Sequence, residues 1–146
     1  MLQRIVKTFL FQDDYIIQWK CWKEVLGKIN GELFAWVFLP NHSHIILKQG
    51  VRSFSDTMSS FKRRVTWMMK QPGGIWQNRF WEHLLRNDND LERHTDYIHV
   101  NPVNHGLTKR AQDYPYSSFK MFVEKEAYPE DWGSVVEIEV TGEPID

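Results

Sequence analysis

Cysteine is almost absent from this sequence, because Cys21 is the single example in 146 residues. A disulfide framework within the chain is therefore excluded. Long hydrophobic runs are also missing, and the apolar N-terminal segment 2–11 is too short and too charged for a signal peptide or a membrane span. We therefore expect a cytoplasmic protein that has no membrane partner.

The chain has no large net charge, but its charges are unevenly distributed. Residues 121–146 contain eight acidic residues and one lysine, so the net charge of −1 for the whole chain hides a net charge of +6 in residues 1–120. A basic body with an acidic tail is typical of a protein that binds a polyanion. The length suits one domain, and we expect a catalytic domain over 1–122 and an acidic C-terminal tail over 123–146.

Hydrophobic periodicity and turn signals predict alternating strands and helices. The expected elements are a short strand over 2–6, a helix from Asp13 or Asp14 to about residue 29, strands over 33–39 and 42–48, a helix from Ser53 or Ser55 to about residue 70, a strand over 75–85, and a helix capped by Asp88 or Asn89 that Pro102 closes or kinks. This order is that of an α+β ferredoxin-like split βαβ sandwich, an antiparallel sheet with two helices on one face. The additional third helix lies beyond that core and is free to carry function. A further strand is possible over 135–140.

Two histidines alternate at the start of the predicted strand 42–48. Because successive side chains of a strand point to opposite faces, His42 and His44 share one face about 6.7 Å apart along the backbone. Two imidazoles in this position can bind one metal ion. The alternative is a pair of ordinary strand histidines near the Pro40-Asn41 turn.

The third predicted helix carries a second candidate pair. Tyr97 and Asn101 are four residues apart, so they lie on one face of the helix. Tyr97 can act as a nucleophile and Asn101 can offer a carbonyl oxygen to a metal ion. The alternative is that Tyr97 is a half-buried packing residue and Asn101 ends the helix before a proline.

Basic and aromatic residues after residue 50 are candidates for binding nucleic acid. Basic side chains can contact phosphates and aromatic or guanidinium planes can stack on bases. The candidates are Arg52, Lys62, Arg63, Arg64, Lys70, Arg79, Trp76 and Trp81. The alternative is a solvated amphipathic helix with tryptophans in the core. We expect Trp19, Trp22 and Trp36 to be core residues and at least one of Trp76 and Trp81 to be partly exposed.

Five separated motifs occur in an order that resembles one known family. They are Pro40-Asn41-His42-Ser43-His44, the run 76–83 (WQNRFWEH), Leu91-Glu92-Arg93, the run 97–103 (YIHVNPV) and Tyr116-Ser117-Ser118-Phe119. Together they resemble the single-tyrosine HUH transposases, particularly the REP-associated tyrosine transposase branch, over roughly residues 9–122. Ser43 departs from the family's usual large apolar residue, and the family has a fuller first strand than this N-terminal segment predicts.

The resemblance implies a metal-dependent endonuclease and strand transferase that acts on single-stranded DNA containing hairpins. It assigns Tyr97 as the nucleophile that forms a 5′-phosphotyrosine, and His42, His44 and Asn101 as ligands of a divalent ion, Mg²⁺ or Mn²⁺. A homodimer is a candidate assembly. Among the other histidines, His94 could orient Tyr97, His99 is expected to pack, and His83 is expected to support the sheet or the rim of the site.

Two other functions remain open at this point. A catalytically inactive relative would keep the basic helix and bind DNA or RNA hairpins without cleaving them. A replication initiator or relaxase would share the His pair, but these enzymes often place two tyrosines close together on the helix, where this chain has only Tyr97.

Overall fold

The computed structural model describes residues 3–10, 15–70 and 76–133, and within β1 and β4 it describes the side chains of 4–7 and 82–84 only. Four strands form one antiparallel sheet with the order β2-β3-β1-β4. The strands are β1 (Gln3–Leu10), β2 (Glu32–Phe38), β3 (His42–Lys48) and β4 (Trp76–Leu84). The helices are α1 (Tyr15–Lys28), α2 (Phe54–Met68), α3 (Asp88–Asn104), the 3₁₀ helix η1 (Ala111–Asp113) and α4 (Phe119–Glu124). This is the predicted α+β ferredoxin-like arrangement.

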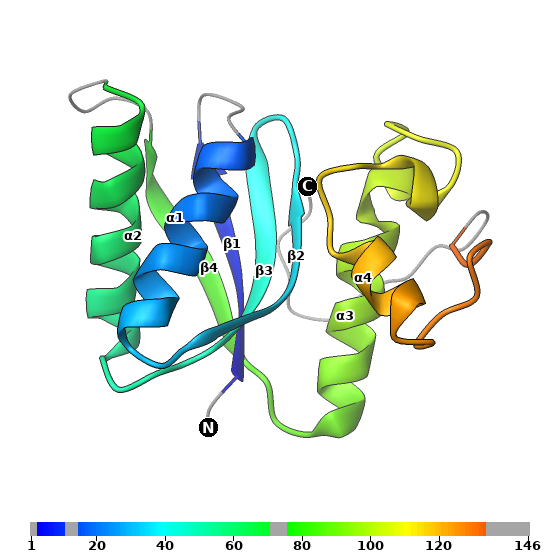
Figure 1. Ribbon diagram of the computed structural model, residues 1–146, viewed down its shortest axis with the longest axis horizontal. Helices are drawn as coiled ribbons and strands as arrows, with labels where there is room; N and C mark the ends of the chain where they lie inside the picture. Colours follow the sequence, from blue (N-terminus) through cyan, green and yellow to red (C-terminus); the bar gives the residue numbers. More distant parts are fainter. Residues whose placement is uncertain (1–2, 11–14, 71–75, 134–146) are drawn as a thin grey trace.

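Helices α1 and α2 cover one face of the sheet (Figure 1). Their buried residues meet Val6, Ile45 and Leu47 of the central strands in one apolar cluster. In that cluster the Trp22 and Phe61 rings stack with centroids 3.8 Å apart. Successive side chains of a strand point to opposite faces, so these residues lie on one face of the sheet and their sequence neighbours lie on the other.

Helix α3 covers the opposite face (Figure 1), where Ile98 joins a second cluster with Ile5, Val37 and Ile46. Helix α3 was expected outside the core, but it forms a core of its own with the sheet. Residues after α3 pack against it in turn: the Tyr128 hydroxyl donates a hydrogen bond of 2.7 Å to Asp96 Oδ1. The division into a catalytic domain over 1–122 and an acidic tail over 123–146 stays a prediction.

Several predicted boundaries need correction. Strand β1 runs over eight residues rather than five, because it lies between β3 and β4 and pairs with both. The N-cap of α3 is Asn87, whose side chain accepts a hydrogen bond from the Asp90 N–H. Pro102 does not end this helix, which continues to Asn104 with the buried proline inside it. The predicted strand over 135–140 lies outside the described residues.

The prediction for the tryptophans is right in part. Trp22 is fully buried and Trp36 packs against the first cluster, but Trp19 is 38% exposed and is not a core residue. Trp19 lies at the margin of the apolar face of α1, where its ring meets the Trp36 ring at 6.5 Å. Among the residues described here, no helix is both long and apolar enough to cross a membrane.

Candidate functional site

The two histidines of β3 meet on the face of the sheet that α3 covers. A tight turn precedes them, in which the Leu39 N–H donates to the His42 carbonyl. The centroids of the His42 and His44 rings are 5.0 Å apart, and the rings are nearly perpendicular. Both side chains are buried, so bulk water has little access to either imidazole.

Helix α3 and its C-cap residue present three polar side chains to this pair at four-residue spacing. The Tyr97 ring packs edge-on against His44 at 5.4 Å, and the His105 ring packs against His42, also at 5.4 Å. Asn101 is halfway between these two contacts on the same helix face and is 1% exposed. Helix α3 therefore brings Tyr97 and Asn101 to the side of the sheet that holds both histidines.

His105 was not predicted to belong to this group. Pro102 was expected to end or kink α3, so the residues after it had no assigned helical face. A signal was nevertheless present, because His105 continues the four-residue spacing of Tyr97 and Asn101.

Burial and a neighbouring cation keep the histidine pair neutral. Desolvation, the nearby His44, and the charges of Lys7 and His105 together lower the pKa of His42 to about 2. Burial first and Lys7 second also hold the pKa of His44 well below its usual value. Lys7 is 1% exposed and pairs with His44 across β1 and β3. Unprotonated imidazoles of this kind have lone pairs that a metal ion can bind.

His99 serves packing, as the sequence predicted. Its ring is buried, one nitrogen lies 2.7 Å from Ser118 Oγ, and the other lies 3.2 Å from the Tyr128 hydroxyl. Burial lowers the pKa of His99 to about 3, so this side chain is a neutral hydrogen-bonding element between α3 and the segment that follows α4.

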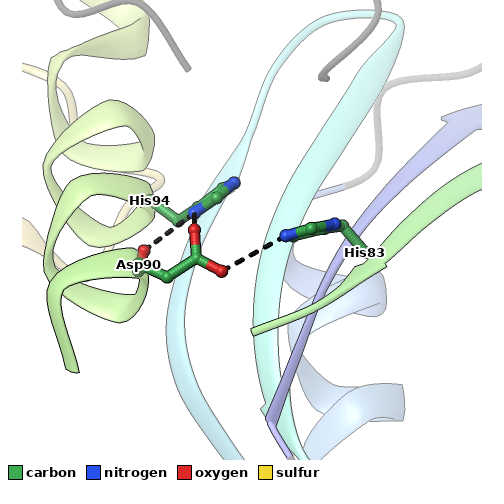
Figure 2. Close-up of side chains that lie close together, drawn as sticks. All are labelled: His83, Asp90 and His94. Carbon is green, nitrogen blue, oxygen red and sulfur yellow. Dashed lines mark hydrogen bonds and ion pairs between the residues drawn. The ribbon is translucent and has the colours of Figure 1, made fainter. Parts of the chain in front are cut away.

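A separate group of metal-binding residue types lies where β4 leads into α3 (Figure 2). His83 of β4 and His94 of α3 both approach the Asp90 carboxylate, and one potential ligand atom from each residue lies within 4.8 Å of the others. Such a cluster can hold a metal ion, although none of its members was predicted as a ligand. The sequence separates the three residues by a turn, so only the folded chain brings them together.

Helix α2, which carries Lys62, Arg63 and Arg64, lies on the other side of the sheet from α3, which carries Tyr97 (Figure 1). Arg52, Arg63, Arg64 and Lys28 line an open groove of about 400 Å³ between α1 and α2. Arg64 is already paired with Glu24 at 3.1 Å, whereas Arg63 and Lys70 are exposed. Lys62 is half-buried, which lowers its pKa. The side chains of Trp76, Arg79 and Trp81 lie outside the described residues.

An antiparallel ferredoxin-like sheet, with a histidine pair facing a tyrosine on a covering helix, is the arrangement expected of a tyrosine transposase. No family model matches the chain. The comparisons with curated proteins and with solved structures do find relatives of this class. The REP-associated tyrosine transposase of Escherichia coli strain K12 is 42% identical over 116 residues, which cover 78% of this chain and 70% of that protein.

A Haemophilus influenzae protein that provisionally carries the same name is 34% identical over 159 residues, covering 98% of this chain and 89% of its own length. A solved structure of a REP-associated tyrosine transposase bound to a REP hairpin superposes with a TM-score of 0.85 and 32% identity, covering 99% of this chain and 93% of that chain. The chain belongs to the REP-associated tyrosine transposase family.

Proposed function

We propose that this protein is a metal-dependent endonuclease and strand transferase that acts on hairpin-containing single-stranded DNA through a 5′-phosphotyrosine intermediate. The edge-on contact of the Tyr97 ring with the buried His44 ring carries the proposal. The similarity to a transposase that was solved with a REP hairpin supports hairpin DNA as the partner.

Tyr97 is the proposed nucleophile. Its phenol oxygen attacks the phosphorus of a phosphodiester, the new P–O bond to tyrosine forms, and the bond from phosphorus to the 3′ oxygen breaks. The phenol loses its proton and the departing 3′ oxygen gains one, which leaves a 5′-phosphotyrosine and a free 3′-OH. The covalent link retains the energy of the broken ester, so the reverse step needs no nucleotide cofactor.

His42, His44 and Asn101 are the proposed ligands of one divalent ion, Mg²⁺ or Mn²⁺. The residues fit such an ion, because the Nε2 atom of His42, both ring nitrogens of His44 and Oδ1 of Asn101 are buried, and burial keeps both histidines unprotonated. Mixed imidazole and amide ligands suit Mn²⁺ somewhat better than Mg²⁺. When bound, the ion would neutralise the phosphodiester and orient its phosphorus.

Binding of the DNA backbone is assigned to the basic residues of α2 and of the segments on either side of it. Arg52, Arg63 and Lys70 are exposed and Lys62 and Arg64 are half-buried, so each can reach solvent. On β4, Arg79, Trp76 and Trp81 are proposed to stack on bases. A DNA molecule that meets both Tyr97 and α2 has to pass around an edge of the sheet, or a homodimer has to supply α2 from its second copy.

Tyr97→Phe tests the proposal. Wild-type protein should form a denaturant-stable adduct with labelled hairpin DNA in Mn²⁺, and the variant should lose this adduct by about 10⁴-fold or more because no phenol oxygen remains. The ring stays in place, so folding should change by at most about 1 kcal/mol. Hairpin affinity should be unchanged.

Two results would contradict the proposal. An adduct that persists in Tyr97→Phe would move the nucleophile elsewhere, with Tyr116 the first choice because it is 38% exposed and Tyr114 is nearly buried. Tight hairpin binding by the wild type, without an adduct in either Mg²⁺ or Mn²⁺, would identify an inactive hairpin-binding relative.

A further inference from the structure

The Asp90 carboxylate stands between two imidazoles that come from different elements (Figure 2). Its Oδ2 atom lies 3.2 Å from Nε2 of His83 on β4, and its Oδ1 atom lies 3.2 Å from Nδ1 of His94 on α3. Asp90 and His94 are four residues apart, so they share one face of the first turns of α3. The strand and the helix are thus joined through one acidic side chain.

We propose that His83, Asp90 and His94 form a second metal site, which takes a transition-metal ion such as Zn²⁺ and ties the start of α3 to the end of β4. Zn²⁺ bonds to imidazole nitrogen and carboxylate oxygen at about 2.0–2.2 Å in tetrahedral sites, so neighbouring ligand atoms lie about 3.3 Å apart. The two contacts of Asp90 use different oxygens, Oδ2 for His83 and Oδ1 for His94. One potential ligand atom from each of the three residues lies within 4.8 Å of the others, so small side-chain shifts would bring them to this spacing. Two imidazoles and one carboxylate favour Zn²⁺ or Co²⁺ over Mg²⁺, which prefers oxygen ligands.

The state of His94 is a second, independent observation. This side chain is 2% exposed. Its Nδ1 atom has two oxygen neighbours on Asp90, the carbonyl at 2.8 Å and the carboxylate. Its Nε2 atom is buried and has no hydrogen-bond partner within the described parts of the chain. Buried polar atoms are rarely left in this condition. An ion bound to Nε2 would remove the deficit, while Nδ1 keeps its hydrogen bond to the Asp90 carbonyl, as metal-bound histidines usually do with their second ring nitrogen.

A metal ion at this site would compete with the groups that already contact Asp90. The Arg86 N–H donates to Asp90 Oδ2 at 3.0 Å, and the Arg86 guanidinium lies 3.7 Å from the same oxygen but is largely exposed. Burial opposes ionisation of Asp90, but hydrogen bonds from the Arg86 N–H and from His83 outweigh it and lower the pKa of Asp90, so its carboxylate is ionised at neutral pH. The ion must therefore take the place of the N–H hydrogen that His83 directs at the carboxylate and compete with an exposed guanidinium, both of which a doubly charged ion can do.

The role of this site is to position α3, and it takes no part in the reaction itself. Tyr97 follows His94 by three residues on α3, and the distance from Asp90 to Tyr97 is two helical turns. Fixing the first turns of α3 to β4 therefore limits how far the tyrosine can move from the sheet. The inference does not depend on the role proposed for Tyr97 or for the pair on β3.

Cobalt titration tests the site directly. Full-length protein that carries His42→Ala and His44→Ala is stripped with a chelator and titrated with Co²⁺, whose visible absorption reports tetrahedral binding. One equivalent of Co²⁺ should bind, Zn²⁺ should displace it, and Zn²⁺ should raise the melting temperature. Adding Asp90→Asn should weaken Co²⁺ binding at least about tenfold. Asp88→Asn is the matched control, since it removes the same charge from an exposed position in the same helical turn.

Asp90 also accepts a hydrogen bond from the Arg86 N–H, so Asp90→Asn could weaken metal binding by disturbing the fold. A second variant avoids this ambiguity. His83→Gln removes one imidazole from the margin of the sheet, where its side chain is 31% exposed, and it should weaken Co²⁺ binding to the same extent while circular dichroism stays unchanged. Failure of the starting protein to bind Co²⁺ or Zn²⁺ would overturn the proposal. Equal affinity in Asp90→Asn, His83→Gln and Asp88→Asn would overturn it as well.

Discussion

The two faces of the sheet are built from different kinds of side chain. Toward α1 and α2 the buried residues are almost all apolar, and the Trp22–Phe61 stack lies in their midst. On the side of α3 several polar side chains are also buried, namely Lys7, His42, His44, His94, His99 and Asn101. Burying polar groups costs free energy unless they are satisfied. The first face thus supplies the stability that lets the second one hold reactive groups.

The largest expected effect on stability comes from the apolar face. Phe61→Ala removes a fully buried ring and its stacking with Trp22, so the free energy of unfolding should fall by about 3–5 kcal/mol. Urea denaturation measures the loss. Trp67→Ala, on the same helix but 67% exposed, is the control and should cost less than about 1 kcal/mol. Equal losses in the two variants would show that the face does not stabilise the protein through its core.

The polar face should make stability depend on pH. An unfolded histidine has a pKa of about 6.5, whereas burial holds the pKa of His99 at about 3. Between these values only the unfolded chain takes up the proton, so stability is complete above pH 6.5 and decreases as the pH falls. From pH 7.5 to pH 5 this one residue should account for a loss of about 2 kcal/mol.

Denaturation of His99→Gln at both pH values isolates this effect. The variant should be less stable than the wild type at pH 7.5, but its stability should change less between the two pH values, by about 2 kcal/mol. His42 and His44 remain in both proteins and cancel in the comparison. An unchanged pH dependence would mean that His99 accepts a proton in the folded protein.

Local patterns were enough to predict most of the fold. Strand β3 begins at His42 and ends at Lys48 as predicted, because a turn and a break flank a run of β-formers. Ser53, one of the two predicted caps, is the N-cap of α2, and its side chain accepts a hydrogen bond from the Asp56 N–H. These features depend on neighbours within a few residues, which the sequence displays directly.

Features that depend on distant partners were missed. The length of β1 comes from pairing with both β3 and β4, and its own mixed composition gave little sign of it. The helical periodicity of the sequence assigns Trp19 to the apolar face of α1. It does not show which part of that face packs against the sheet. The placement of Lys7 beside His44, and of His83 beside Asp90, follows from strand order and cannot be read from spacing.

A substitution of Lys7 tests how its positive charge affects the buried pair His42 and His44. Burial is the main reason why the pKa of His42 and His44 is lowered, and the ammonium of Lys7 adds to it. The same positive potential would oppose a divalent ion bound there. Lys7→Met keeps the stem, so Mn²⁺ affinity at the His pair should rise about tenfold, equivalent to about 1.4 kcal/mol. Adduct formation should nevertheless slow, because a cation that could offset the phosphodiester charge is lost.

Isothermal titration with Mn²⁺ and the adduct assay report the two effects separately. Lys48→Met is the control, since Lys48 lies on the same strand as His44 but pairs with Glu32 at 3.5 Å near the sheet margin. If Lys7→Met and Lys48→Met bind Mn²⁺ with the same affinity, Lys7 does not act on the proposed ion site at His42 and His44.

The smallest expected effect concerns the outer surface of α2, and it tests whether DNA binds on that side of the sheet. Arg63 is exposed on α2, so Arg63→Ala should weaken hairpin binding and reduce the slope of log affinity against log salt by about 0.9 for one lost phosphate contact. Arg64→Ala should change the slope less, because Arg64 already pairs with Glu24. Lys20→Ala, an exposed position on α1, should leave the slope unchanged. Equal slopes in all three variants would confine the hairpin to the face that carries Tyr97, and the two faces would then divide stability from function completely.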